Sequence, residues 1–597
     1  MRVTLPISIL LPLLLATALH AAKAPPMTSQ PGLSATAGSK PNVVVFLSDD
    51  QGWGDLSING NNELSTPNID RLAREGARFM QFYVQPVCSP TRAEFLTGCY
   101  HPRSNVYSTS AGGERMDLDK TTIADVFRKA GYATGAFGKW HNGMQYPYHP
   151  NGRGFDEFYG FCSGHWGNYY DPMLEHNGKI VRGKGFCIDD FTDKAIDFIE
   201  QHKDQPFFVF LPYNTPHSPM QVPDEYWERF KDKTLTLQKY DNNHTRCALA
   251  MCENIDWNVG RVLQKLEQLN LSEETIVVYF NDNGPNGSRW NDGLKGKKGS
   301  TDEGGVKSPL HIRYPKGIQP GIQPVGVSGA IDLMPTLADL AGITDQLNVL
   351  SLDGLSQVHQ LEGKAPHKDR VMVNHWRGRL SARNQRFRLD QKGKLYDMKE
   401  DPGQLQPVNQ LYPEVAKVLE KAVQDYRKTV LSELKANKLD SRPFIVGHPD
   451  ARYTHLPARD AEATGKIKRS SKHPNDSFYT NWTSKDESIF WNAVVPASGR
   501  FQVTLYYTCP QGSTGSKLIL KSSGDNLTFV IDEPHDPPLV GKSDDRSSRS
   551  ESYVKDFKAK PIGIVELAEG PQKLELVPQE IPGDQVMDFR LLVLERL

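Results

Sequence analysis

The first half of the chain alternates between continuous apolar runs and amphipathic segments. The run "NVVVFLSDD" (residues 42–50) is apolar until it ends in two acids, as is typical of a buried parallel strand with polar groups at its carboxyl end. The next segment, "TPNIDRLAREGARF", predicts a helix with Thr66 as its N-cap and Gly76 at its end. A strand followed by a helix is the basic unit of an α/β sheet.

The same alternation continues along the chain. "TTIADVFRKAG" predicts a helix closed by Gly131, and "YATGAFGKW" predicts a strand after it. "PFFVFLPY" (206–213) and "TIVVYFND" (275–282) predict two more strands, with a helix between them whose apolar face includes Val259 and Leu263. We therefore expect an α/β fold with a large mixed, mostly parallel sheet sandwiched by helices. In such sheets, ligands bind beyond the carboxyl ends of the strands.

The character of the chain changes after this sheet. "DLMPTLADLAGI" predicts a further helix, and "KGKLYDMKEDPGQ" followed by "YPEVAKVLEKAVQDYRK" predicts a smaller α+β subdomain. The next segment is polar and rich in proline and histidine, which favours a linker, and the last part consists of short strands separated by turn residues, which indicates a β-sandwich. The predicted units are the main domain 41–345, the subdomain 346–437, the linker 438–475 and the sandwich 476–597.

The amino terminus has the features of an export signal. Residues 1–24 contain an early cation, Arg2, then an apolar stretch and then small residues, which predicts a signal peptide. A membrane anchor is less favoured, because Pro6 and Pro12 interrupt an apolar run that is shorter than a bilayer span. Residues 25–40 predict a flexible leader. The sequence thus predicts a secreted or periplasmic protein with no membrane span after signal cleavage.

Composition adds two constraints. The 597 residues include 70 Lys and Arg against 71 Asp and Glu, so no overall charge favours nucleic acid, and a charged substrate must be attracted by a local site. Seven cysteines are an odd number for an exported chain, which indicates one special thiol. The other six either pair as disulfides or stay buried thiols, and their spacing does not choose between these.

Acidic residues end two of the predicted strands. Asp49 and Asp50 end the first strand, and Asp282 and Asn283 follow the last one. Carboxylate and amide oxygens are hard ligands that suit Ca²⁺ or Mg²⁺ and bind zinc poorly. Acidic pairs also occur as solvated turns, but two such pairs in one sheet favour a divalent-metal site.

Cationic residues follow strands in the same way. "GKWHNG" contains Lys139 and His141, "NTPHSP" contains His217, and "GKKGS" contains Lys298 next to Lys297. Each could separately be a surface lysine or a satisfied histidine. Together they indicate a metal site ringed by cations, which is a pocket for an oxyanion such as sulfate or phosphate.

One cysteine precedes a helix in "QPVCSPTRAEFLTGC". The helix is expected from near Pro90 to Gly98, which places Cys88 beside a helix amino terminus, where anions are favoured. A thiol there would be acidified and open to oxidation. A thiolate nucleophile, as in cysteine phosphatases, needs no hard metal, so the metal site favours an oxygen nucleophile instead.

The run "CSPTRAEFLTG" resembles the signature of the type I sulfatases, members of the alkaline-phosphatase-like superfamily. Other segments resemble blocks of that family in the same order: "NVVVFLSDDQGWGD", "TPNIDRLAREGARF", "GYATGAFGKWHNG", "NTPHSP", "VVYFNDNG", "KGSTDEGGVKSP", "DLMPTLADLAGI" and "KLYDMKEDPG". The resemblance covers residues 41 to about 430. It implies a sulfatase fold and a sulfuric ester hydrolase.

The resemblance also implies roles for individual residues. Cys88 would be converted to Cα-formylglycine by a maturation enzyme that reads Pro90 and Arg92, and its hydrate would attack sulfur with help from Asp282. The implied ligands of one Ca²⁺ are residue 88 and the acidic-loop residues Asp49, Asp50, Asp282 and Asn283.

The implied roles of the cations divide into two groups. His217 and Lys298 would contact the sulfate, and one of them would protonate the leaving alcohol. Arg92, Lys139 and His141 would hold the modified residue. His141 would then accept a proton so that sulfate is released.

Substrate residues are predicted from aromatic clusters. His165, Trp166 and Tyr169, together with Tyr170, lie in "CSGHWGNYYDP", a region that often shapes the substrate pocket in this family, and His375 belongs to a second cluster with Trp376 and Arg377. Each of these rings could instead serve in packing.

The predicted sandwich loosely resembles a carbohydrate-binding module, although it could merely buttress the main domain. We therefore expect a sulfated glycan as substrate. The alternatives are a phosphate or phosphonate ester hydrolase of the same superfamily, and a non-catalytic glycan-binding protein whose cysteine is never converted.

Overall fold

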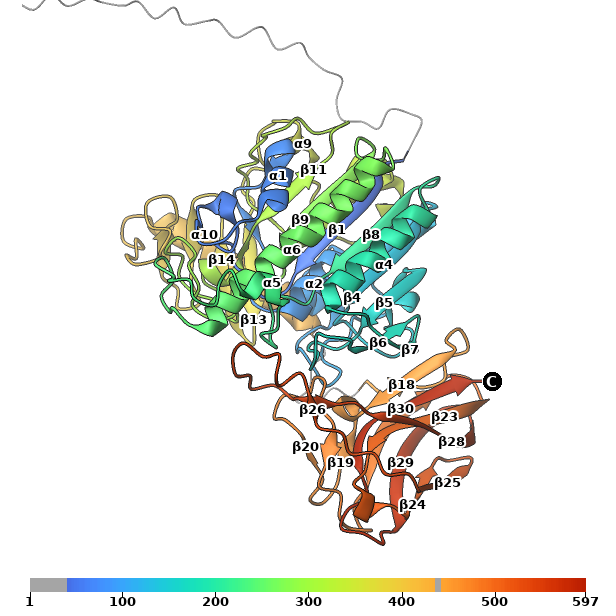
Figure 1. Ribbon diagram of the computed structural model, residues 1–597. Helices are drawn as coiled ribbons and strands as arrows, with labels where there is room; N and C mark the ends of the chain where they lie inside the picture. Colours follow the sequence, from blue (N-terminus) through green and yellow to red (C-terminus); the bar gives the residue numbers. More distant parts are fainter. Residues whose placement is uncertain (1–39, 435–441) are drawn as a thin grey trace, which may run out of the picture.

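The computed structural model describes residues 40–434 and 442–597. The predicted signal peptide (1–24) and nearly all of the leader (25–40) lie outside these residues. An α/β body, a smaller four-stranded sheet and a carboxyl-terminal β-sandwich follow one another along the chain (Figure 1). Among the helices of the described ranges, none combines the length and apolar character that a bilayer crossing needs.

The body is built on a nine-stranded mixed sheet, which confirms the predicted fold class. Its strand order is β2-β11-β9-β1-β8-β4-β5-β6-β7, and the five central strands are parallel. The central strands are β9 (Thr275–Asn281), β1 (Asn42–Ser48), β8 (Phe207–Pro212), β4 (Ala133–Lys139) and β5 (Glu157–Phe161). The antiparallel edges are β11 (Leu310–Arg313) with β2 (Ala77–Arg78), and β6 (Met173–His176) with β7 (Lys179–Arg182).

Alternate residues of β1 serve two hydrophobic cores, one on each face of the sheet. Val43 and Val45 belong to the core shared with α2 (Cys88–Thr97), α3 (Ile123–Lys129) and α8 (Leu333–Leu340). Val44 and Phe46 belong to the core shared with α1 (Pro67–Glu75), α4 (Cys187–Gln201) and α6 (Asn243–Gln268). Figure 1 looks onto the face covered by α4 and α6. An apolar run without alternation is therefore what a strand with two covered faces requires.

Helix α1 lies between Thr66 and Gly76, as the sequence predicts, but Thr66 does not act as a side-chain cap. The Thr66 hydroxyl caps no backbone group there. Instead, the carboxylate of Asp256 on α6 accepts from the backbone N–H groups of Asn68 (2.9 Å) and Ile69 (2.8 Å). Gly76 follows α1 without a left-handed conformation, and it is needed because a Cβ there would overlap the backbone of Ile312. Tertiary contacts thus decide both ends of this helix.

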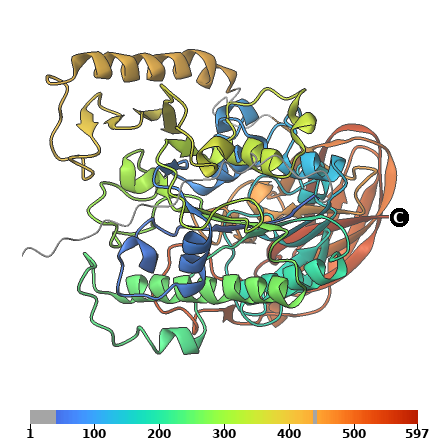
Figure 2. The same cartoon turned by 90° about the horizontal axis from the view of Figure 1, so that it is seen from above.

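Two small sheets extend the body. Strand β3 (Phe82–Tyr83) pairs with β10 (Lys307–Ser308) and with β12 (Ser328–Gly329). An antiparallel sheet of β13 (Met372–Trp376), β14 (Arg379–Arg383), β15 (Phe387–Leu389) and β16 (Leu395–Asp397) carries α10 (Pro413–Thr429) on one face. In Figure 2, α10 and α6 lie at opposite sides of the molecule. The remaining helices of the described residues are α5 (Asp224–Trp227), α7 (Glu303–Val306) and α9 (Val358–Leu361). Short 3-10 turns occur at Ser57–Asn59, His101–Ser104, Pro150–Arg153, Ala330–Asp332, Thr344–Leu347, Leu431–Glu433, Ala458–Asp460 and Gln511–Ser513.

The carboxyl-terminal region forms two sheets around its own core. The first sheet contains β17 (Phe444–Ile445), β22 (Ile489–Val495), β29 (Gly570–Glu580), β24 (Ser516–Lys521), β25 (Asn526–Ile531) and β19 (Glu462–Ala463). The second contains β20 (Lys468–Arg469), β21 (Tyr479–Thr480), β30 (Asp588–Arg596), β23 (Gly499–Thr508), β28 (Lys558–Leu567) and β18 (Tyr453–Pro457). Strands β26 (Leu539–Val540) and β27 (Val554–Lys555) pair with each other.

The segment 438–475, predicted as a linker, contains strands of the sandwich instead. Strands β17, β18, β19 and β20 lie in this interval and pair with strands of the sandwich. Most of these strands are only two residues long and lie at sheet edges. Such strands leave no long apolar run in the sequence, so the segment has the composition of a linker. Residues 438–441 lie outside the described part of the chain.

All seven cysteines are buried free thiols. This result decides between the two alternatives for the six cysteines other than Cys88, because none of them pairs as a disulfide.

Two glycines allow β4 and β5 to approach one another directly before Lys139. Gly138 and Gly160 are paired across the strands and both have positive φ, +136° and +154°. A Cβ at Gly160 would overlap the backbone carbonyl of Gly138, whereas a Cβ at Gly131 (φ +87°) would meet no atom within 4 Å.

We expect Gly160→Ala to destabilise the body by about 3 kcal/mol or more, because strain and a backbone clash act together. Gly131→Ala is the matched control and should cost only about 1 kcal/mol, since strain acts alone. Chemical unfolding followed by tryptophan fluorescence measures both. Equal losses in the two variants would contradict the packing argument.

Candidate active site

The acidic residues that the sequence singled out converge at the carboxyl edge of the sheet. Strands β1 and β9 are parallel neighbours with Ser48 opposite Asn281, so the residues after them lie side by side. The backbone N–H of Asp50 donates to Asp282 Oδ1 (3.1 Å), and Asn283 Nδ2 donates to Asp50 Oδ1 (2.8 Å). Asp49, Asp50, Asp282 and Asn283 are all fully buried.

Each buried carboxylate has a cationic partner. Lys139, at the end of β4, forms an ion pair with Asp49. Arg92 on α2 lies 3.0 Å from Asp282 Oδ2 and 3.9 Å from Asp49 Oδ2, and its Nη1 donates to the Lys139 carbonyl (2.8 Å). Burial of three carboxylates without such partners would be prohibitive.

Asp50 has its own partners on the other side of the cluster. Lys298 Nζ lies 2.6 Å from Asp50 Oδ1, and His217 Nε2 lies 3.7 Å from Asp50 Oδ2. Lys297 is exposed, whereas Lys298 reaches the cluster. The geometry therefore favours the choice of Lys298.

The carboxylates differ in their proton affinity. Burial raises the pKa of Asp49, but the charges of Lys139, His217 and Arg92 outweigh it and hold that pKa well below its ordinary value. Burial and the charge of Asp49 raise the pKa of Asp282 to about 7, despite Arg92. Asp282 thus binds a proton more readily than Asp49 does.

A divalent cation fits the oxygens that remain. Asp49 Oδ1 and Asn283 Oδ1 are buried and find no hydrogen-bond partner among the described residues. Ligand atoms of Asp49, Asp282 and Cys88 lie within 4.8 Å of one another, as do those of Asp49, Asp50 and His217. Unpaired buried oxygens of carboxylate and amide type are the donors that Ca²⁺ prefers.

Cys88 is the first residue of α2 and lies next to this cluster, 3% exposed. Burial raises the pKa of its thiol and outweighs the charges of Lys139 and Lys298. The expectation of an acidified thiol is therefore wrong, because the helix amino terminus is buried along with the cysteine. The unmodified residue is a poor thiolate nucleophile.

His141 approaches from the loop after β4. Its Nε2 lies 2.9 Å from the Thr109 carbonyl, which fixes the ring with a proton on Nε2, and its Nδ1 is a buried atom without a hydrogen-bond partner in the described ranges. Burial and the charge of Lys139 lower the pKa of His141 well below its ordinary value. The ring is therefore neutral and has a lone pair available as a proton acceptor.

The predicted substrate residues do not form one surface. Tyr169 is 1% exposed, and its hydroxyl lies 3.0–3.1 Å from the carbonyls of Asn214, His217 and Ser218. It supports the loop that carries His217, so the prediction that it stacks on a sugar is wrong.

His375 is also covered. Its ring stacks on His101 with centroids 5.2 Å apart, and burial with the charge of His101 lowers its pKa to about 3. Trp376 is 5% exposed, with Arg377 over its ring. The second predicted aromatic cluster is therefore part of the packing, apart from the exposed Arg377.

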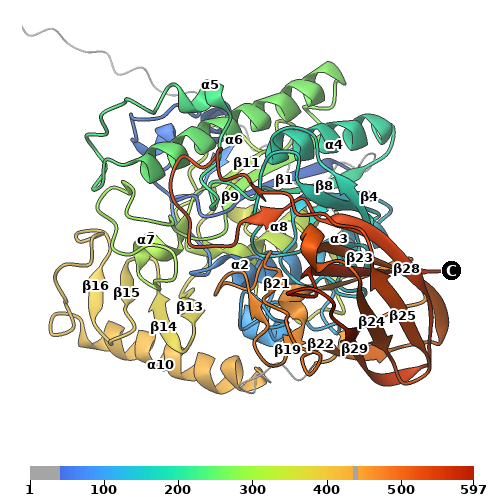
Figure 3. The ribbon, with the colours of Figure 1, turned by 60° about the horizontal axis from the view of Figure 1, so that its bottom comes forward.

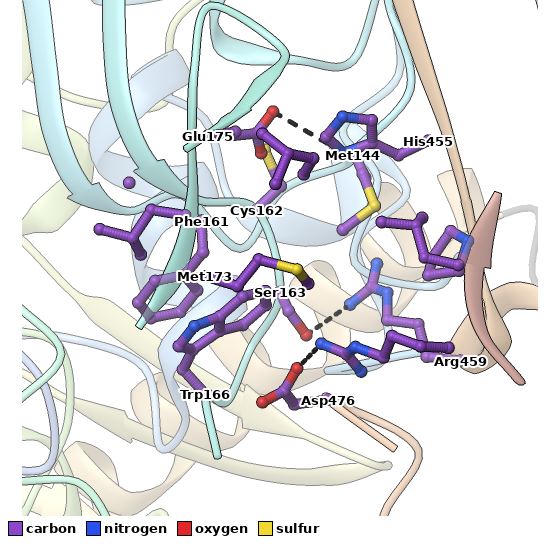
Figure 4. Close-up of a pocket in the computed structure, with 16 residues that line it drawn as sticks. Met144, Phe161, Cys162, Ser163, Trp166, Met173, Glu175, His455, Arg459 and Asp476 are labelled. Carbon is purple, nitrogen blue, oxygen red and sulfur yellow. Dashed lines mark hydrogen bonds and ion pairs between the residues drawn. The ribbon is translucent and has the colours of Figure 1, made fainter. Parts of the chain in front are cut away.

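Trp166 stacks on Phe161 in the wall of a cavity between the body and the carboxyl-terminal region, with Arg459 and Asp476 also lining it (Figure 4). Arg590 lies over its ring. His165 lies closer to the cluster, because its ring is 5.7 Å from that of His217 and its Nδ1 is 3.1 Å from the Ser218 carbonyl. Of the four predicted substrate residues, His165 and Tyr169 thus adjoin the predicted sulfate ligand His217, Tyr169 through the backbone carbonyl and His165 through the ring.

Several contributors had no usable signal in the sequence. Thr91 Oγ1 donates to the Asp282 carbonyl (2.6 Å), and Arg289, 4% exposed, donates to Asp55 Oδ2 (2.9 Å) and to the Asp50 carbonyl. Glu551 of the carboxyl-terminal region accepts from Ser218 Oγ (2.7 Å), one residue from His217. Its separation of 333 residues from Ser218 hides that pairing from any local pattern.

Comparisons with known proteins agree with this geometry. The family model described as Sulfatase matches residues 41–343, just over half of the 597 residues. An uncharacterized sulfatase, YdeN, of Escherichia coli (strain K12) is 31% identical over 405 residues, covering 56% of this chain and 70% of its own. N-acetylgalactosamine-6-sulfatase of Mus musculus is 31% identical over 348 residues, covering 52% of this chain and 64% of its own. The crystal structure of Ps i-CgsB in complex with k-i-k-neocarrahexaose is 28% identical with a TM-score of 0.61, covering 66% of this chain and 94% of that one.

The oxygen cluster predicts a measurable metal affinity. We expect Asp282→Asn to weaken Ca²⁺ binding about tenfold or more, because the variant keeps the side-chain shape but removes one of three carboxylate charges. Isothermal titration of chelator-treated protein with Ca²⁺ reports this without any enzyme assay. Asp425→Asn on the exposed face of α10 is the control and should bind like the wild type. An unchanged affinity in Asp282→Asn would reject this ligand set.

Proposed function

This chain belongs to the sulfatase family of sulfuric ester hydrolases, and from that membership we propose that it desulfates carbohydrates by means of a Cα-formylglycine at position 88 and one bound Ca²⁺. The observation that carries the proposal is the position of Cys88. It lies beside the oxygen cluster of Asp49 and Asp282, with Lys139 and Lys298 close enough for their charges to act on the thiol.

The modification explains an otherwise inert cysteine. A hydrated formylglycine supplies two hydroxyl groups on one carbon, one to attack sulfur and one to allow release of sulfate. Pro90 and Arg92 stand at the positions that a maturation enzyme would read before folding. In the folded chain, Arg92 is fully buried and holds Asp282 and the Lys139 carbonyl instead.

Asp49, Asp50, Asp282 and Asn283, together with residue 88, would hold Ca²⁺, which supplies positive charge against the sulfuryl oxygens. The lysines act at the same group from two sides. Lys139 lies on the Asp49 side, and Lys298 lies with His217 on the Asp50 side. A sulfate between these groups would be bound by charge-assisted hydrogen bonds.

Two histidines are placed for opposite proton transfers. His141 presents a buried lone pair at Nδ1 from the Lys139 side, which suits it to accept a proton from residue 88. His217 Nδ1 lies 2.7 Å from the Ser218 carbonyl, so it carries a proton and its Nε2 faces Asp50. His217 or Lys298 would protonate the leaving alcohol.

The substrate class follows from relatives. The mouse relative is named for an N-acetylgalactosamine sulfate, and Ps i-CgsB was crystallised with k-i-k-neocarrahexaose. A carbohydrate sulfate is therefore the favoured substrate of this chain. The proposed location is secreted or periplasmic, on the basis of the predicted signal peptide.

Conversion of Cys88 predicts a mass change. The peptide Phe79–Arg92 from purified, active protein should be lighter than its cysteine form by about 18 Da, since sulfur and two hydrogens are replaced by one oxygen. Cys88→Ala should lose all turnover while its thermal unfolding midpoint stays within about 2 °C of the wild type. Full activity in this variant would refute the nucleophile assignment.

Substrate preference separates the rival functions. Released sulfate should be detected from a panel of mono- and disulfated galactose, N-acetylgalactosamine and carrageenan oligosaccharides. Matched phosphate monoesters should react at least about a hundredfold more slowly in kcat/KM, because a site tuned to a singly charged ester meets an extra charge. Faster phosphate release would favour a phosphatase. Binding of the panel without release, in protein whose residue 88 is still cysteine, would favour a glycan-binding protein.

A further inference from the structure

The carboxyl-terminal region reaches across the body to the candidate active site. Between β26 and β27, a long loop of residues 541–553, here called the strap, runs over the body (Figures 1 and 3). The strap is docked against the segment that carries His217: Gln221 Nε2 donates to the Gly541 carbonyl (2.8 Å) and to Asp545 Oδ1 (3.0 Å), and the Arg546 N–H donates to the Met220 carbonyl (2.8 Å).

A buried ion pair fixes the conformation of the strap. Arg549 has no exposed side-chain surface, and it binds Asp545 at 2.5 Å and the Gly167 carbonyl at 2.5 Å. Gly167 is two residues from His165, so this arginine links the strap to the loop of His165, while its partner Asp545 accepts from Gln221 of the His217 segment. The strap is therefore held against the body by buried and charged contacts rather than by surface contacts alone.

This anchoring places one carboxylate beside the reaction site. Glu551 accepts a hydrogen bond from Ser218 Oγ (2.7 Å), and its side chain stays partly exposed. Burial raises the pKa of Glu551, but the charges of His217 and His165 outweigh it and lower the pKa to about 2.

The carboxyl-terminal region supports the other histidine as well. Asn475 Nδ2 donates to the Thr109 carbonyl (2.9 Å), the same carbonyl that fixes His141. Arg459 binds Glu114 (2.6 Å) and Ser163 Oγ (3.1 Å) on the body. The sandwich is thus connected to both histidines of the candidate site, which an independently tethered glycan-binding module would not need.

We propose that Glu551 is a specificity-determining residue supplied by the carboxyl-terminal region. The sulfate is expected against Lys298 and His217, and the partly exposed Glu551 is bonded to Ser218, the residue after His217, so we place the leaving sugar on the side of Glu551. A carboxylate there accepts hydrogen bonds from free hydroxyl groups and repels a second sulfate or a uronate carboxylate. This inference rests on the proposed sulfatase function, and it names neutral sugar around the scissile ester as the preferred substrate.

The test compares two forms of one sugar. The monosulfated oligosaccharide that the wild-type enzyme desulfates fastest is paired with the same sugar bearing a second sulfate on the neighbouring hydroxyl. The full-length wild type should prefer the monosulfated form. Glu551→Gln, which keeps the acceptor for Ser218 but loses the charge, should raise kcat/KM for the disulfated form about tenfold and change the monosulfated value less than about threefold.

Two further variants make the result decisive. Glu566→Gln, on the exposed surface of β28 where Glu566 faces Arg500, removes the same charge from the sandwich and should leave both values unchanged. An unaltered preference in Glu551→Gln would overturn the proposal. Equal loss of activity on both sugars in Glu551→Gln and Ser218→Ala would also overturn it, because Glu551 would then only position the His217 loop. A wild type that releases sulfate from no sugar would instead refute the proposed function.

Discussion

Three carboxylates buried at one edge of a parallel sheet are the constraint on which the rest of this structure depends. The in-register pairing of β1 with β9 forces Asp50 next to Asp282, and water is excluded from both. Such a cluster is tolerated only where cations offset its charge. Lys139, Arg92 and Lys298 are therefore needed by the fold as well as by the proposed reaction, and the proposed Ca²⁺ would add positive charge next to Asp282.

The same burial determines the state of Cys88. A helix amino terminus and two lysines would acidify an exposed thiol, but in this chain desolvation is the larger effect and the pKa rises. Cys88 is buried and unreactive as a thiol, and it lies beside carboxylates that suit a hard cation. These two observations support the proposal that Cys88 is the precursor of an oxygen nucleophile. Desolvation also lowers the pKa of His141 and keeps its ring neutral, which suits the proposed role of this residue as a proton acceptor.

The body and the carboxyl-terminal sandwich work as one unit in this molecule. Asn475 donates to the carbonyl that holds His141, and Glu551 accepts from the residue after His217. The buried Arg549 binds the Gly167 carbonyl of the body. In the proposed function, substrate selection is separated from chemistry, because the body would hold the sulfate and the strap would face the sugar. A strap can vary in sequence without disturbing the sheet, because it is attached to loops and not to the strands.

The sequence by itself determined the α/β class, the parallel strands and the acidic and cationic residues that follow them, because apolar runs with two covered faces and polar strand ends are local patterns. It also indicated that Cys88 lies at a helix amino terminus, although the helix begins at Cys88 itself and not near Pro90. Only the tertiary structure decided that Asp256 caps α1, that Tyr169 and His375 are packed inside the protein, that strands β17 to β20 occupy the predicted linker, and that Glu551 contacts the His217 loop. The physical reason is common to all of these: the partner lies far away in the chain, and an aromatic ring or a carboxylate has no fixed role until it is known what covers it.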